Sequence, residues 1–350
     1  MIKINNIYYM LSYAFTVLKE DRYKNLASED FKNSTELYAA ILIQGLSNQV
    51  KRGLHHEYIE QEDALSTIRG KINVTRSIKD LDIVNKHLHC SFDEYSSNNY
   101  MNQIIKTTLT LLLKSDIPKK RKKEIKRLTF YFEQVDFLNY RKINWNLRFT
   151  SNNRTYKMLI SICNLIIEGL IQTTREGNKQ FMNFVDEQRM SRLYEKFILE
   201  YYKKEFPELS VSASHIPWVV DDGITTMLPL MKSDIMLSYK DEYLIIDAKY
   251  YGKTVQNFYN TPKMHSGNLY QIFTYVKNLD ASSNTKTKKV SGMLLYAKTD
   301  EAVTPHQTFQ LSGNQISVTT LDLGGEFSKI VEELKKIIEE HFEISFDDRY

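Results

Sequence analysis

Two short segments in the second half of the sequence constrain this chain more than any other feature. Residues 233–239 alternate polar and apolar side chains, and residues 243–249 form a second strand-like segment whose apolar run ends in charged residues. Residues 240–242, Lys-Asp-Glu, are typical of the turn between two strands. Asp234 and Asp247 lie equally far from the centre of that turn, so an antiparallel hairpin places their carboxylates side by side.

The expected hairpin gathers groups that suit phosphodiester hydrolysis. Asp247 and Lys249 share a strand face, while Ala248 points away and leaves its backbone carbonyl near the same site. Asp234, Asp247 and that carbonyl offer hard oxygen ligands for Mg²⁺, with Mn²⁺ expected to substitute. Lys249 is then placed to position a water or to stabilise the transition state as a cation. The alternative is an ordinary surface Asp-Lys pair, but an Asp that ends an apolar run is costly to bury without partners.

Residues of two expected helices point toward the same centre. Glu195 shares a helix face with apolar neighbours, so it is a candidate for an additional carboxylate, with an exposed Glu paired with basic neighbours as an equal alternative. Gln271 and Tyr275 are four residues apart on one helix face. We interpret this pair as positioning the DNA backbone or orienting Lys249. The alternative is a Tyr that caps the core beside a Gln in solvent.

Composition sets limits on the class of protein. At 350 residues with 42% hydrophobic content, the chain is long enough for a large core and two domains. A formal net charge of +4 is too low for a protein that coats nucleic acid, so any DNA contact is expected to be local. The only cysteines, Cys90 and Cys163, exclude a disulfide framework and a cysteine-rich metal site, and favour a reducing, cytoplasmic setting. The most apolar stretch, residues 158–171, is shorter than the ~20 residues that span a bilayer, so no membrane association is expected.

The order of expected elements predicts two domains, of α+β and α/β type. Residues 58–77 are rich in β-branched residues around one glycine, as in a short hairpin or projecting finger, within an otherwise helical first half. Periodicity lapses around residues 177–186. We therefore expect a mostly helical N-terminal domain with a small β finger or barrel over residues 1–175, and a second domain over residues 176–350. The helices of the first domain are expected within residues 1–60, 98–114 and 156–171.

The second domain is expected to mix strands and helices, which indicates an α/β fold. Its expected elements are a helix at 191–206, strands between 209 and 249, a helix at 267–279, strands between 289 and 320, and a closing helix at 326–342.

A basic run follows Pro118. Seven of the nine residues 119–127 are Lys or Arg. A solvated helix face is the simpler interpretation, and a patch that tracks phosphates is the alternative.

Two other kinds of site are excluded by the sequence. His265 is the only histidine close in sequence to the expected hairpin, and no His-Glu-x-x-His pattern occurs, so a zinc site is not expected. The only Gly-Lys-Thr begins at Gly252, and a Walker A motif requires glycine where Asp247 stands. The chain is therefore not expected to hydrolyse nucleotides by itself.

The motifs together resemble one family. The segments around Asp234, Asp247 to Lys249, and residues 265–271 resemble McrC, the endonuclease subunit of McrBC-type modification-dependent restriction systems, in the PD-(D/E)XK nuclease superfamily. The likeness continues at the N-terminus, in Asn6-Ile-Tyr-Tyr-Met-Leu-Ser-Tyr-Ala-Phe, and in Ile68-Arg-Gly-Lys-Ile, so it covers both halves of the chain.

The resemblance implies a division of labour. It implies that residues 1–175 engage a hexameric McrB-like AAA+ GTPase, whose own domains read methylated DNA, and that residues 176–350 carry a PD-(D/E)XK nuclease. It also implies that a second copy of the chain is needed to cut both strands of double-stranded DNA. Asp234, Asp247 and Lys249 match the catalytic pattern of the family, and Gln271 and Tyr275 match the Gln-x-x-x-Tyr helix of RecB-like nucleases. Glu195 matches a helical Glu of the wider superfamily.

Two other functions fit parts of the sequence. The first is a stand-alone repair nuclease of the RecB kind; the second is a catalytically silent adaptor that stimulates a motor NTPase. Intact Asp234, Asp247 and Lys249 weigh against the adaptor.

Overall fold

The chain forms two compact units. The computed structural model describes residues 2–150, 153–173, 179–250, 255–258, 261–282, 288–298 and 305–344. Unit 1 consists of Met1–Ser34 together with Glu176–Tyr350, and unit 2 consists of Thr35–Arg175. The sequence-based division at residue 175 thus coincides with one boundary, but it assigns the first 34 residues to the N-terminal domain, whereas the structure packs them with the C-terminal half.

Contacts of α1 (Ile4–Ala14) explain why the start of the chain belongs to unit 1. The ring of Tyr9 stacks on that of Phe327 with centroids 4.4 Å apart. Asn6 is 2% exposed and donates from Nδ2 to the backbone oxygen of Leu323 at 2.7 Å. A buried amide needs such a partner, and residues more than 300 positions later provide it. Local sequence patterns carry no information about such a pairing.

Unit 1 is built on a six-stranded mixed sheet in the order β12-β13-β11-β8-β7-β4. Strand β11 runs parallel to both β8 and β13, and the remaining pairs are antiparallel. The six strands are β4 (Ser210–Ser212), β7 (Ile235–Tyr239), β8 (Glu242–Lys249), β11 (Lys289–Ala297), β12 (Gln307–Leu311) and β13 (Asn314–Leu321). Two small antiparallel pairs are β5 (His215–Ile216) with β6 (Met231–Lys232), and β9 (Val255–Phe258) with β10 (Thr261–Met264).

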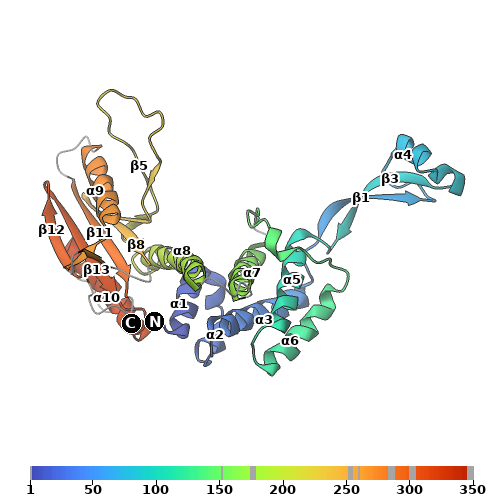
Figure 1. The fold of residues 1–350 in the computed structure, drawn as a ribbon, viewed down its shortest axis with the longest axis horizontal. Helices are drawn as coiled ribbons and strands as arrows, with labels where there is room; N and C mark the ends of the chain where they lie inside the picture. The colour runs from blue at the N-terminus through green and yellow to red at the C-terminus, as the bar shows by residue number, and fades with distance from the viewer. Residues whose placement is uncertain are drawn as a thin grey trace. The chain divides into compact units, whose positions relative to one another are not determined.

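Helices cover this sheet, as Figure 1 shows for α9. The helical elements of unit 1 besides α1 are η1 (Thr16–Lys19), α2 (Asp21–Ala27), α8 (Lys179–Glu205), α9 (Ser266–Ala281) and α10 (Phe327–Phe342). Ile272 and Val276 of α9 pack with Ile245 of β8 and Leu294 of β11 in one buried cluster. Helix α8 begins twelve residues before the predicted start at residue 191, because the polar residues 186–189 interrupt the apolar periodicity without breaking the helix. The predicted mixture of helices and strands is confirmed.

Unit 2 combines helices with a three-stranded sheet. Its helical elements are α3 (Ser34–Arg52), α4 (Val74–Lys79), η2 (Asp82–Asn85), α5 (Tyr100–Lys114), α6 (Lys119–Thr129), η3 (Phe130–Phe132), η4 (Tyr140–Lys142) and α7 (Arg154–Thr173). Its strands are β1 (Glu57–Leu65), β2 (Lys71–Ile72) and β3 (Leu88–Ser96). Across the described ranges of both units, no helix is at once long enough and apolar enough to span a membrane.

Residues 57–96 form the finger, which extends from the helices of unit 2 (Figure 1). Of the two expectations for this segment, the projecting finger is observed (Figure 1), whereas a hairpin around Gly70 is wrong, because β3 lies between β1 and β2 and pairs with both. Gly70 instead allows its backbone to lie close to β3. Its φ is +68°, and a Cβ at this position would lie 2.3 Å from the backbone oxygen of Ser91. The partner of β1 is separated from it by α4 and η2, so residues next to Gly70 do not reveal the pairing.

Candidate active site

The β7–β8 hairpin brings Asp234 and Asp247 together. Its register pairs Ile235 with Ile246, and its turn lies at Lys240, which adopts a left-handed φ of 52°. Asp234 directly precedes β7, so one further step of the register sets it opposite Asp247. The predicted hairpin and its register are thereby confirmed.

Asp247 is a buried carboxylate whose capacity to accept hydrogen bonds is unused. Its exposed fraction is 1%, and neither carboxylate oxygen accepts a hydrogen bond within the described part of the chain. The Nζ of Lys249 lies 2.9 Å from Oδ2 as an ion pair. A buried charge with so few partners is costly, and groups of this kind gather at functional sites. The remaining lone pairs of Asp247 are those that a cation would fill.

Asp234 adds a second carboxylate beside it. Its Oδ2 accepts a hydrogen bond from the backbone N–H of Ala248 at 3.1 Å. Burial, followed by the charges of Asp247 and Glu195, raises the pKa of Asp234 to about 8. Removal from water and like charges both disfavour the ionised form. Ionisation of all three carboxyl groups beside the ammonium of Lys249 is therefore unfavourable unless a further cation binds.

Glu195 approaches the same centre from α8. Burial raises its pKa above the ordinary value, and the charges of Lys249 and Asp247 also act on it. Its Oε1 accepts a hydrogen bond from the hydroxyl of Ser191 at 2.9 Å. Ser191 was not predicted as part of the site, because its position one helical turn before Glu195 allows this bond but does not distinguish it from an exposed serine. The structure thus places Glu195 at the centre and not on an exposed helix face.

A chain of hydrogen bonds links Lys249 to α9. Lys249 donates from Nζ to Oε1 of Gln271 at 3.2 Å, and Gln271 donates from Nε2 to the hydroxyl of Tyr275 at 3.0 Å. Gln271 is therefore not a free side chain in solvent, as the alternative interpretation required. A second buried bond, from Asn268 Nδ2 to the Tyr296 hydroxyl at 2.9 Å, escaped the sequence analysis. Tyr296 lies on β11 opposite Lys249 of β8, so this bond ties α9 to the strand beside the one that carries Lys249.

All six predicted side chains converge from α8, the start of β7, β8 and α9. The arrangement joins three carboxyl groups, one ammonium and a polar amide, which can hold a divalent cation and act on a phosphate. The oxygen ligands are of the type that Mg²⁺ and Mn²⁺ prefer, and the unfilled acceptors of Asp247 fit such an ion. The segment from Gly252 to Thr254 lies outside the described residues.

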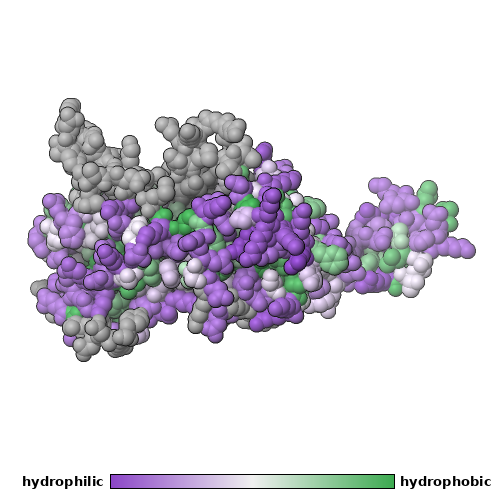
Figure 2. Space-filling view, turned by 90° about the horizontal axis from the view of Figure 1, so that it is seen from below, coloured by the Kyte–Doolittle hydropathy of each residue, from purple (hydrophilic) through white to green (hydrophobic). Residues whose placement is uncertain are grey.

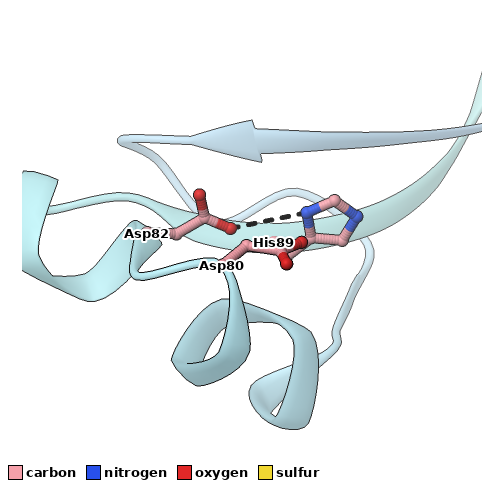
Figure 3. A group of neighbouring side chains, drawn as sticks. All are labelled: Asp80, Asp82 and His89. Atoms are coloured by element: carbon pink, nitrogen blue, oxygen red, sulfur yellow. Dashed lines mark ion pairs between the residues drawn. The ribbon is translucent and has the colours of Figure 1, made fainter.

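A separate group of ligand-type side chains lies in the finger. The ligand atoms of Asp80, Asp82 and His89 lie within 4.8 Å of one another, and Figure 3 shows the Asp82 carboxylate facing the His89 ring. His89 Nδ1 is 3.5 Å from Asp82, and its Nε2 is 3.7 Å from Glu62. Arg76 pairs with both Glu62 and Asp80. These ion pairs fasten α4 and η2 to the strands of the finger, and we assign the group a structural role.

Comparison with known proteins identifies relatives over nearly the whole chain. The family model described as "McrBC 5-methylcytosine restriction system component" matches residues 4–297. A curated relative, the "Type IV methyl-directed restriction enzyme EcoKMcrBC" of Escherichia coli (strain K12), is 29% identical over 347 residues, which are 97% of this chain and 98% of the relative.

Two solved structures show weaker likeness. One is the refined half-complex from the tetradecameric assembly of Thermococcus gammatolerans McrB AAA+ hexamers with bound McrC. It is 16% identical, with a TM-score of 0.48, and the match covers 94% of this chain and 75% of that chain. The other is the cryo-EM structure of the Thermococcus gammatolerans McrBC complex, 18% identical with a TM-score of 0.40 over 57% of this chain and 58% of that chain.

Proposed function

The chain belongs to the family of McrBC 5-methylcytosine restriction system components, and on that basis we propose that it is the Mg²⁺-dependent endonuclease subunit of such a system. It cuts methylcytosine-containing DNA together with an AAA+ GTPase partner. The observation that carries the nuclease assignment is the buried Asp247 with unfilled acceptors, set beside Asp234, Lys249 and Glu195. We assign the hairpin and its flanking helices to the PD-(D/E)XK nuclease fold.

Three carboxyl groups and one backbone carbonyl are the proposed metal ligands. Asp234, Asp247 and the carbonyl of Ala248 hold the ion, and Glu195 supports it directly or through a water. Mg²⁺ bound there, or Mn²⁺ in its place, supplies the Lewis acidity that polarises a scissile phosphate and lowers the pKa of a water. The burial of Asp234 and Glu195 favours metal binding at this centre. Because water solvates these carboxylates poorly, a bound cation stabilises their ionised forms more than it would stabilise those of exposed carboxylates.

Lys249 is the proposed cation that acts on the phosphate. Its ammonium contacts both the carboxylate of Asp247 and the amide oxygen of Gln271, and these contacts fix its position. A fixed positive charge stabilises the negative charge that develops on the phosphate oxygens, and it does so more strongly in a water-poor site. Gln271 and Tyr275 act as positioning residues, since the bond between them orients the amide oxygen that holds Lys249.

The proposed partner surface is the part of unit 2 that projects. The finger carries exposed apolar side chains near its tip: Ile78 at 59%, Leu81 at 63% and Val84 at 76%. Apolar side chains gathered on a projecting element are typical of a surface that binds another protein. Since the first 34 residues pack in unit 1, we narrow the partner-binding segment from residues 1–175 to Thr35–Arg175.

A single centre of this kind cuts one strand at a time, so two copies of the chain meet to break both strands. The AAA+ GTPase recruits methylated DNA and brings two copies together. Because the chain has no Walker A motif, the energy of nucleotide hydrolysis comes from that partner.

The test is a reconstituted cleavage assay with the full chain, an McrB-like AAA+ GTPase from the same organism, GTP, Mg²⁺ and methylated duplex DNA. We expect double-strand breaks in the complete mixture and none when the partner, GTP, Mg²⁺ or the methyl groups are omitted. Equal cleavage without the partner contradicts the proposal in favour of a stand-alone nuclease. Stimulated GTP hydrolysis without any cleavage contradicts it in favour of a silent adaptor.

A further inference from the structure

The outer face of α6 carries an unusual concentration of positive charge. Seven of its first nine residues are Lys or Arg, and Glu124 is its only acidic residue. Ile125 and Leu128 are buried and set the core side of the helix. The cations outside that core side are Lys119, Lys120, Lys122, Lys123, Lys126 and Arg127. In the views of the fold, α6 lies at the lower edge of Figure 1, and Figure 2, seen from below, shows a largely hydrophilic surface there.

Acidic side chains in the described part of the chain do not balance these charges. In the described residues, Arg121 is the only one of the seven basic residues that pairs with a carboxylate, Glu124 at 3.5 Å. Helix α10 provides a contrast, because its Lys335 and Lys336 each pair with a Glu four residues later. A helix face that served only solubility would be expected to alternate charges, as α10 does.

The arrangement also opposes the stability of the helix. Lys119, Lys120 and Lys122 lie in the first turn, where the helix dipole favours negative charge. Lys119 with Lys123, and Lys122 with Lys126, are like charges four residues apart, which destabilise a helix. A bound polyanion removes both penalties, because its charge meets the helix N-terminus and the repelling lysines together.

Neighbouring residues extend the surface beyond α6. A hollow of about 380 Å³ lies between α3 and α6, and Lys51, Arg121, Arg127 and Tyr131 are among the residues that line it. The ring of Tyr131 is 57% exposed, and the adjacent Phe130 is 66% exposed. Positive charge with exposed rings beside it is typical of surfaces that contact nucleic acid.

We propose that this basic face, residues 119–127 with the adjoining hollow, binds the phosphate backbone of double-stranded DNA. The identification of the bound polyanion as DNA rests on the proposed function. Lysine is depleted in protein–protein interfaces, and five of the seven cations are Lys, which favours phosphates over an acidic protein. Lys119, Lys123 and Lys126 form a row about 10 Å long at 1.5 Å per residue, which spans about three phosphates of one strand.

The experiment measures binding without cleavage. The full chain is titrated into a fluorescent duplex of about 30 base pairs in EDTA, at several NaCl concentrations around 100 mM. The triple variant K119Q/K123Q/K126Q is compared with wild type and with K203Q/K329Q/K336Q, which removes the same charge from helices of unit 1. We expect the α6 variant to lose at least about tenfold in affinity for DNA. The slope of its plot of log affinity against log salt concentration should become shallower by about two to three, because each lost phosphate contact changes the slope by about 0.9. The control variant changes by less than about twofold.

Three results overturn the inference. The α6 variant could bind DNA with wild-type affinity, the control variant could lose as much DNA affinity as the α6 variant, or the α6 variant could keep its DNA binding but no longer bind the AAA+ partner. Thermal melting checks the fold, and the α6 variant is expected to melt at or above wild type because repulsion is removed. If it melts lower, the single variant K123E replaces it in the same titration. The binding titration contains EDTA and therefore does not depend on cleavage. If the chain binds DNA through α6 but cuts no DNA in Mg²⁺, the proposed nuclease function is contradicted, whereas this inference still holds.

Discussion

Gly292 offers a direct test of how α9 is held over the active site. It lies on β11 beneath α9, and a Cβ at this position would be 2.8 Å from Ile272 Cγ1 and 2.8 Å from Val276 Cγ2. Both side chains are fully buried, at 0% exposure, so neither has room to move aside. Gly292→Ala therefore pushes α9 away from the sheet.

The size of the effect follows from these contacts. Overpacking by one methyl group in a tight core costs about 1–3 kcal/mol. For a unit of roughly 200 residues, each kcal/mol lowers the melting midpoint by about 2–4 °C, so a fall of about 2–12 °C is expected. Gln271 and Tyr275 neighbour Ile272 and Val276 on α9, so Lys249 is displaced as well, and cleavage falls by about tenfold.

Thermal melting and cleavage rates of the variant check this prediction. Gly267→Ala is the matched control, because it lies on the same helix and a Cβ there meets nothing within 4 Å. It should melt at or slightly above wild type, by the ~0.4–1 kcal/mol typical of Gly→Ala at a compatible site. If Gly292→Ala melts and cuts like wild type, α9 is not packed on β11 as described.

Three further outcomes are expected. In metal-free protein, Asp234→Asn raises the melting midpoint, and by more at pH 8 than at pH 5. Burial raises the pKa of Asp234 from 3.8 to about 8, so its ionised form destabilises the folded protein by an amount that is absent below pH 3.8 and grows as the pH rises toward 8. An equal rise in melting midpoint at both pH values contradicts this prediction. After chelation, cleavage returns with Mg²⁺ or Mn²⁺, whereas return with Zn²⁺ alone rejects the oxygen ligand set. Lys249→Ala lowers cleavage by more than ~100-fold while pull-down of the AAA+ partner is unchanged, and cleavage near the wild-type rate excludes a catalytic role for the ammonium.

Local spacing made the centre of the site predictable. The pairing of Asp234 with Asp247 follows from a two-residue turn and equal distances on both sides, because hairpin register is set by the turn. Helical spacing likewise placed Gln271 and Tyr275 on one face, and the sheet beneath α9 brought that face to Lys249. These inferences needed only residues within one hairpin or one helix.

Pairings between distant segments were not predictable. The packing of α1 in unit 1 depends on Asn6 and Tyr9 meeting residues more than 300 positions later. The partner of β1 in the finger is β3, which follows two intervening helical segments. Ser191 and Asn268 were missed for a different reason: a lone polar residue on a helix has the same pattern whether it faces solvent or a buried partner.

The most direct test of the account is cleavage of methylated duplex DNA by the full chain carrying Asp247→Ala, in the presence of the AAA+ partner, GTP and Mg²⁺. The substitution removes a buried carboxylate that pairs with Lys249, but Lys249 keeps its hydrogen bond to Gln271, so the variant should fold and bind its partner like wild type. We predict that it cuts more than ~100-fold more slowly, the scale of removing a group that stabilises the transition state. Cleavage by Asp247→Ala at the wild-type rate would contradict the assignment of this centre as the nuclease site.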